Sequence, residues 1–108
     1  MTQQIFVSDL DHTLLNARAE LSDYSFQTLK NLLEQGLLFT VATARSSHAL
    51  SKPLKGLPLA LPVIELNGGY ITNLQTGIHE HVQAISEPVI HDLLKHLSSE
   101  QAYFLLSF

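Results

Sequence analysis

The stretch Ile5-Phe6-Val7-Ser8-Asp9-Leu10-Asp11 decides the fold of this protein. Its apolar start, rich in branched and aromatic residues, is typical of a buried strand, and the polar residues that follow end that strand abruptly. Asp9 and Asp11 stand two positions apart, so in an extended backbone both carboxylates project to the same side. Such a pair can hold a hard cation, or one carboxylate can attack phosphorus while the other moves a proton. The alternative is a solvated turn that Thr13 caps.

The sequence on the carboxyl side of this strand predicts alternating helices and strands. Apolar residues recur at helical spacing from Ser22 to Gln35, which indicates an amphipathic helix. Residues 37–42 and 61–66 are apolar runs typical of strands covered on both faces, and between them lies a short helix candidate at 46–55 that Pro53 should end. This order predicts an α/β fold that begins a doubly wound, Rossmann-like parallel sheet with three strands.

The pattern changes after Asn67-Gly68-Gly69. Residues 70–72 and 78–82 flank a loop that contains glycine, which predicts a β-hairpin. Ser86-Glu87-Pro88 then opens a second amphipathic helix, whose apolar positions share one face. Residues 102–108 predict one more strand.

Composition excludes several classes of protein. The chain has 108 residues, of which 45% are hydrophobic and 15% charged, a profile typical of one soluble globular unit. Cys is absent, which excludes disulfides, and no apolar run reaches the roughly 20 residues of a membrane-spanning helix. Residues 1–4 lack the basic region of a secretory signal, so a cytoplasmic location is expected. A net charge of −4, with six Lys and Arg in total, provides no basic stripe for nucleic acid.

Polar residues also follow the second and third predicted strands. Thr43 and Arg45 follow one of them, and Asn67 and Gly68 follow the other. Taken singly, Thr43 predicts a helix cap, Arg45 a solvated first-turn residue and the glycines a tight turn. Open α/β sheets bind ligands outside the carboxyl ends of their strands, so all four residues are expected beside Asp9.

These strand ends resemble the motifs of the haloacid-dehalogenase superfamily. Asp9-Leu10-Asp11-His12-Thr13 resembles its first motif, Asp-x-Asp-x-Thr, and Val41-Ala42-Thr43-Ala44-Arg45 resembles its second. Asn67-Gly68-Gly69 is similar to a turn of the Cof-type (class IIB) branch. His12 and Ala44 are departures, since that branch usually has Gly at both positions.

The resemblance implies a magnesium-dependent phosphatase that forms an aspartyl-phosphate. Its substrates would be small phosphorylated metabolites such as sugar phosphates. Asp9 would be the nucleophile and Asp11 the general acid and base, and both would help bind Mg²⁺. Contacts to phosphate or substrate would come from Thr43, Arg45, Asn67 and Gly68.

The resemblance also implies that only an N-terminal portion is present. Residues 1–84 would be part of the core and 85–108 the beginning of a cap module, whereas the family's downstream Lys and acidic motif are not identifiable. Later strands of the family would cover the free edge of the Ile5–Val7 strand. We therefore expect a second copy of the chain, as a homo-oligomer, or the missing C-terminal half to cover that edge.

Two alternatives to a complete enzyme follow from the same residues. The chain could be a catalytically inactive fragment that persists as a structural or binding oligomer, so whether it is itself an enzyme stays open. A phosphoacceptor receiver also uses Asp, Thr and Lys on a doubly wound sheet. Receivers carry the phosphorylated Asp at the end of the third strand, where this chain has Glu65-Leu66-Asn67, which disfavours that class.

Overall fold

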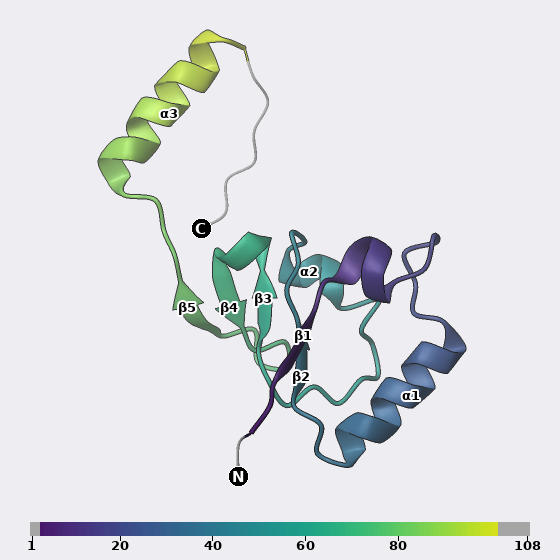
Figure 1. The fold of residues 1–108 in the computed structure, drawn as a ribbon. Helices are drawn as coiled ribbons and strands as arrows, with labels where there is room; N and C mark the ends of the chain where they lie inside the picture. The colour runs from purple at the N-terminus through teal and green to yellow at the C-terminus, as the bar shows by residue number, and fades with distance from the viewer. Residues whose placement is uncertain (1–2, 102–108) are drawn as a thin grey trace.

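A computed structural model describes residues 3–101 and shows strands at the centre, with helices arranged around them (Figure 1). The elements follow in this order: β1 (Phe6–Ser8), the helical turn η1 (Leu10–Leu14), α1 (Asp23–Glu34), β2 (Phe39–Val41), α2 (Ser47–Leu50), β3 (Val63–Glu65), the turn η2 (Leu66–Gly68), β4 (Tyr70–Thr72), β5 (His79–Val82) and α3 (Glu87–Ser99).

The first three strands run in parallel, as the sequence predicts. β1 pairs with β2, so that Phe6 lies opposite Phe39, and a parallel bridge between Ala42 and Ile64 continues the arrangement to β3. The Thr40 hydroxyl adds a tie from β2 by donating to the Pro62 carbonyl at 2.7 Å. The carboxyl ends of all three strands therefore meet at one edge, which confirms the expected α/β class and the partial Rossmann-like sheet.

The predicted hairpin is confirmed, and it continues from β3. β3 pairs antiparallel with β4, with Val63 opposite Thr72, and β4 pairs antiparallel with β5. Gly77 closes the connecting loop at φ +73°, a backbone conformation that glycine adopts without steric cost. The hairpin thus extends the strand layer on the side away from β1.

The core lies between the parallel strands and the helical segments. Ser22 caps α1, because its hydroxyl accepts the Ser25 N–H at 3.1 Å, and the chain turns away from the helix at Gly36 with φ +97°. α2 ends at Leu50, earlier than the predicted range 46–55, and a turn then leads into Pro53. The buried apolar side chains are Leu10, Leu15, Leu33, Phe39, Val41, Leu50, Leu54 and Val63.

The strand that decides the fold is more exposed than its sequence predicts. Ile5, Phe6 and Val7 are 59%, 51% and 51% exposed, although their apolar run indicated a buried strand. The reason is that β1 pairs along one edge only, with β2, within residues 3–101. Its second edge has no neighbouring strand in the described part of the chain, so its apolar side chains on both faces lack cover from that side.

α3 stands apart from the other helices and strands of residues 3–101. None of its described side chains is buried, and it rises beyond the carboxyl ends of the parallel strands (Figure 1). No helix among the described residues is long and apolar enough to cross a membrane. The strand predicted for residues 102–108 lies outside the described residues.

Candidate active site

A cavity of about 570 Å³ opens at the carboxyl ends of the parallel strands. Five of the six predicted site residues line it, and the sixth, Arg45, contacts the cavity wall through Asp11. The lining residues are Asp9, Asp11, His12, Ala42, Thr43, Ala44, Ile64, Asn67 and Gly68. The topology thus brings together residues that lie as many as 59 positions apart, from Asp9 to Gly68.

Asp9 directly follows β1 and begins η1. Its Oδ1 accepts the Leu10 N–H at 2.7 Å, while the Leu10 side chain is fully buried in the core. The Ser8 hydroxyl donates to the Asp9 carbonyl at 2.7 Å. The buried leucine therefore anchors the backbone between the two acidic residues, and Asp9 itself remains exposed to solvent.

Asp11 and Arg45 form a bidentate ion pair. Arg45 donates from Nε to Asp11 Oδ2 at 2.8 Å and from Nη2 to Oδ1 at 2.6 Å, and its Nη1 donates to the Ala49 carbonyl at 3.2 Å. These hydrogen bonds lower the pKa of Asp11, and the same contact raises the pKa of Arg45. The arginine therefore holds Asp11 ionised, and both oxygens of that carboxylate have donors.

Thr43 is buried where β2 ends. Its N–H donates to the Ile64 carbonyl and its carbonyl accepts the Asn67 N–H, each at 2.9 Å. Its hydroxyl oxygen accepts the Arg45 N–H at 3.1 Å, within the loop before α2, whose N-cap residue is Ser46 and not Thr43. A hydroxyl that accepts one hydrogen bond can still donate another, so the Thr43 O–H can donate to a ligand in the cavity.

The turn η2 holds three successive residues at positive φ. Leu66, Asn67 and Gly68 have φ values of +50°, +54° and +96°. Asn tolerates this region and Gly is unstrained there, whereas a leucine at positive φ is an outlier. A Cβ built on Gly68 would meet nothing within 4 Å, so the backbone conformation, and not crowding, favours glycine. Backbone strain of this kind is concentrated at functional sites in many proteins.

Comparison with known families decides the class of this fold and site. Residues 6–107 match the family model of haloacid dehalogenase-like hydrolases. The chain belongs to this family. The predicted family is thereby confirmed.

Relatives of this haloacid dehalogenase-like chain include phosphatase YwpJ of Bacillus subtilis, 27% identical over 101 residues, which are 94% of this chain and 35% of that protein. A solved haloacid dehalogenase-like hydrolase from B. subtilis is 27% identical with a TM-score of 0.73, covering 91% of this chain and 34% of its own. A further one, from Bacteroides thetaiotaomicron, is 24% identical with a TM-score of 0.75, over 93% and 39%. The chain spans about a third of the length of the curated relatives it matches.

Two residues that were not predicted as contacts of this haloacid dehalogenase-like site lie in it or beside it. His12 lines the cavity at φ +59°, a conformation in which the Gly usual in the Cof-type branch carries no strain. Glu65 is only 2% exposed, and its Oε1 accepts the Ser47 N–H at 3.1 Å. The signal for Glu65 was an acidic residue inside an apolar run, because a buried carboxylate requires hydrogen-bond donors.

The cavity offers few ligands for a metal ion. Asp9 and Asp11 supply carboxylates there, but residues 3–101 contain no group of three His, Cys, Asp or Glu side chains that could hold a metal ion. Mg²⁺ in proteins usually keeps several waters and uses one or two carboxylates, so the pair fits such a water-rich site. The Asp9 carboxylate is the better metal ligand, since both oxygens of the Asp11 carboxylate already accept hydrogen bonds from Arg45.

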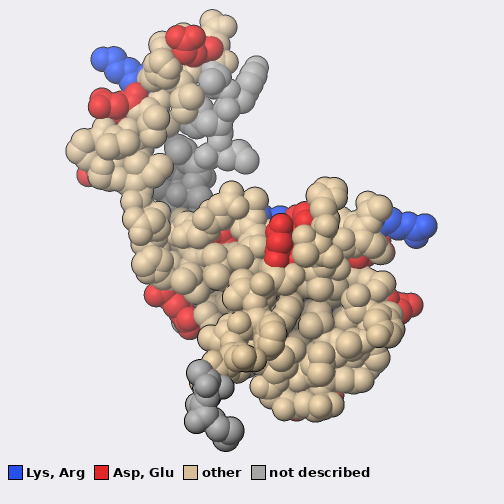
Figure 2. Space-filling model, viewed as in Figure 1, with Lys and Arg blue, Asp and Glu red and all other residues tan. Residues whose placement is uncertain are grey.

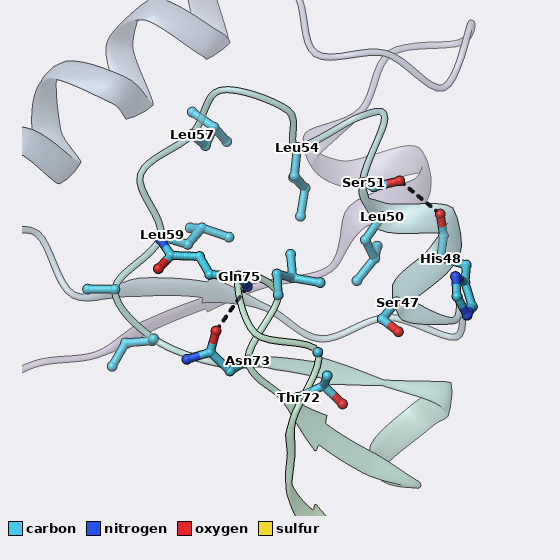
Figure 3. Close-up of a pocket in the computed structure, with 14 residues that line it drawn as sticks. Ser47, His48, Leu50, Ser51, Leu54, Leu57, Leu59, Thr72, Asn73 and Gln75 are labelled. Carbon is cyan, nitrogen blue, oxygen red and sulfur yellow. Dashed lines mark hydrogen bonds between the residues drawn. The ribbon is translucent and has the colours of Figure 1, made fainter. Parts of the chain in front are cut away.

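A second cavity, of about 510 Å³, lies beside α2 and the hairpin loop (Figure 3). It shares no lining residue with the strand-end cavity, and leucines supply much of its wall. Its polar groups are partly paired with one another: Asn73 accepts the Gln75 N–H at 2.9 Å, and the Ser51 hydroxyl donates to the His48 carbonyl at 3.1 Å. It holds no acidic pair, and the strand-end cavity therefore remains the candidate active site.

Charge is sparse on the face shown in Figure 2. Lys and Arg appear there as small separate groups, and most of the surface consists of uncharged residues. That face provides no continuous basic stripe of the kind that follows a nucleic-acid backbone.

Proposed function

We propose that this chain supplies the nucleophile-bearing part of a magnesium-dependent phosphomonoester hydrolase that acts on small phosphorylated metabolites, such as sugar phosphates, in the cytoplasm. The observation that carries the proposal is the strand-end cavity, which gathers Asp9, Asp11, Thr43 and Asn67. Membership of the haloacid dehalogenase-like hydrolases supports the reaction class. A phosphate group requires hydrogen-bond donors and positive charge to neutralise it, and the side chains of Thr43 and Arg45 could supply these at this edge of the sheet.

In the proposed reaction a carboxylate oxygen of Asp9 attacks phosphorus. The ester P–O bond breaks, its electron pair stays on the leaving oxygen, and that oxygen takes a proton from Asp11. Water then attacks the aspartyl-phosphate and gives its proton to Asp11. The bond between phosphorus and Asp9 breaks, which releases phosphate and restores the carboxylate.

Substrate binding would involve the other strand-end residues. The Thr43 hydroxyl has a proton to donate to a phosphoryl oxygen, and Asn67 and Gly68 line the same cavity. Mg²⁺, held by the Asp9 carboxylate and the Asp11 backbone carbonyl, would supply neutralisation of negative charge.

Arg45 would pair first with Asp11 and then, once substrate binds, with the phosphate group. Its ion pair lowers the pKa of Asp11 and so opposes the protonated form that the acid step needs. A phosphate group that attracts Arg45 would release Asp11 and raise the pKa of its carboxyl. Arg45 would in this way couple substrate binding to the protonation of the acid.

The test is turnover of an aryl phosphate with Mg²⁺ by the purified chain, at a known oligomeric state, beside Asp9→Asn. Because the chain carries only part of the family's motifs, we expect little turnover, and any turnover should fall to background in Asp9→Asn, since an amide is not a nucleophile for phosphorus. Asp92→Asn on α3 is the matched control, since it removes an exposed carboxylate far along the chain from the site. Turnover that persists in Asp9→Asn would contradict the assigned nucleophile.

An inactive fragment that persists as a structural or binding oligomer is the second candidate. This candidate is favoured by the ion pair with Arg45, which engages the Asp11 carboxylate proposed as the acid. It is also favoured by β1, which has exposed apolar side chains and an edge without a neighbouring strand among residues 3–101. A second copy of the chain, or the C-terminal half of a longer protein, would pair with that edge. A folded chain without turnover that forms a dimer by light scattering, and becomes monomeric in Val7→Lys, would support this candidate. A monodisperse monomer at all concentrations would contradict it.

The proposed domain boundary separates residues 1–84, part of the core, from residues 85–108, the beginning of a cap module. Every described side chain of α3 is at least partly exposed, which supports that division. Limited proteolysis should cut first near residues 83–86 and leave the core portion intact. Initial cleavage inside 1–84 would argue against this boundary.

A further inference from the structure

Glu65 is an acidic side chain in an apolar setting. It ends β3, it is 2% exposed, and Val63 on the same face of the strand is fully buried. Within the described part of the chain, Glu65 Oε2 has no hydrogen-bond partner. Burying a carboxylate is costly, so the position of this residue calls for a specific role.

The other oxygen of Glu65 caps α2 from a neighbouring strand. Its Oε1 accepts the Ser47 N–H at 3.1 Å, across 18 positions of sequence. Ser47 is the first residue of α2, and the N-cap residue Ser46 makes no side-chain capping bond. The N–H groups of the first helical turn have no partner inside the helix, so Glu65 supplies an acceptor that Ser46 does not.

This contact completes a set of ties between two strand-end segments. Backbone bonds join the Leu66 N–H to the Arg45 carbonyl at 3.0 Å and the Asn67 N–H to the Thr43 carbonyl at 2.9 Å. The bond from Ser47 to Glu65 fastens the same loop two residues further on. Hydrogen bonds therefore hold the backbone on both sides of Arg45, and from this position its side chain contacts Asp11.

We propose that Glu65 is a positioning residue, which holds the loop 43–47 so that Arg45 engages Asp11 and Thr43 faces the cavity. The consequence for catalysis rests on the proposed phosphatase function, whereas the positioning itself does not. Glu65 acts through Ser47 and does not line the cavity.

Two-dimensional NMR of this chain tests the proposal without turnover. The sequence contains two arginines, Arg18 and Arg45, so the side-chain Nε–H signal of Arg45 can be followed against that of the exposed Arg18. In Glu65→Leu we expect the Arg45 signal to move toward that of Arg18, and the Ser47 amide to exchange at least about tenfold faster. Glu65→Gln keeps an oxygen acceptor and should retain both features.

A second pair of variants covers the case in which Glu65→Leu fails to fold. Ser47→Pro removes the donated N–H at the first helical position, where proline is tolerated, and Ser46 already has the extended backbone that precedes proline. Ser47→Ala keeps the N–H and is the matched control. We expect the Arg45 signal to move in Ser47→Pro and to stay in Ser47→Ala. An unchanged Arg45 signal in folded Ser47→Pro would overturn the proposal, as would an unchanged signal in folded Glu65→Leu.

Inorganic phosphate separates this inference from the proposed function. With Mg²⁺ present, we expect the amide signals of Thr43 and Asn67 to shift on addition of phosphate, and to shift less at the same concentration in Glu65→Leu. A wild-type chain that neither responds to phosphate nor turns over an aryl phosphate would count against the proposed function. The positioning role would still stand or fall on the Arg45 signal.

Discussion

α1 and α3 have closely similar sequence patterns and opposite positions in the molecule. Each is an amphipathic helix that follows a serine, with 12 residues in α1 and 13 in α3. α1 buries Leu33, which is 9% exposed, against the strands, whereas Leu93 of α3 is 44% exposed and none of its described neighbours in the helix is buried. Amphipathic spacing therefore predicts that a helix forms and which face is apolar, but not what that face contacts.

The largest expected difference between the two helices concerns their leucines. Leu33→Ala should lower the free energy of unfolding by about 3 kcal/mol, because it leaves a cavity in the core. Leu93→Ala should cost less than about 0.5 kcal/mol, because this residue is 44% exposed and lies outside the core. Urea denaturation with equal slopes measures both values. An equal cost at Leu93 would break the comparison and show that the apolar face of α3 is packed, for example in an oligomer.

The two helix ends offer a second, smaller test. Gly36 follows α1 at φ +97° with open space around it, and Gln101 follows α3 at φ +54°. Gly36→Ala should destabilise the protein by about 1–2 kcal/mol, the cost of placing a Cβ in the left-handed region. Gln101→Gly should slow amide exchange in the last turn of α3 and change the free energy of unfolding by less than about 0.5 kcal/mol. Faster exchange in Gln101→Gly would argue against a strained α3 end.

Loss of the N-cap side chain should also lower the free energy of unfolding more at α1 than at α3, by a smaller amount than the change at Gly36. The Ser22 hydroxyl accepts the Ser25 N–H, whereas Ser86 makes no side-chain capping bond. Ser22→Ala should therefore cost about 1 kcal/mol, and Ser86→Ala should be nearly neutral. Thermal unfolding of the two variants under identical conditions provides the comparison. A matching loss in Ser86→Ala would reveal a cap that forms at α3 in solution.

The smallest effect on stability is expected from the ion pair of the site. Arg45 lowers the pKa of Asp11, so the pair stabilises the fold above the unfolded pKa of about 3.9 and this contribution is lost as pH falls through the lower folded value. Arg45→Met should raise the pKa of Asp11 toward its ordinary value, as measured by NMR titration of the carboxyl carbon. Signals from α3 should not change, since that helix lies apart from the site (Figure 1). A shift across α3 would show that the two regions are coupled.

Local sequence signals predicted the positions of the elements well. Ser22 and Gly36 marked the ends of α1, and the glycine-containing loop marked the hairpin. Five predicted site residues line one cavity, because parallel strands place their carboxyl ends at one edge. The exposure of Phe6 and Val7 was not predictable from their own apolar run, since burial depends on which strands lie beside β1.

By itself, the sequence determined the order of strands and helices, the family and the residues gathered at the strand ends, because periodicity, caps and motif spacing are local properties of the chain. Only the tertiary structure decided that Arg45 engages Asp11 and that Glu65 caps α2. It also decided that α1 buries a leucine, whereas no described residue of α3 is buried. Those outcomes depend on contacts between distant segments. A side chain selects its partner from the groups that the fold brings within hydrogen-bonding distance.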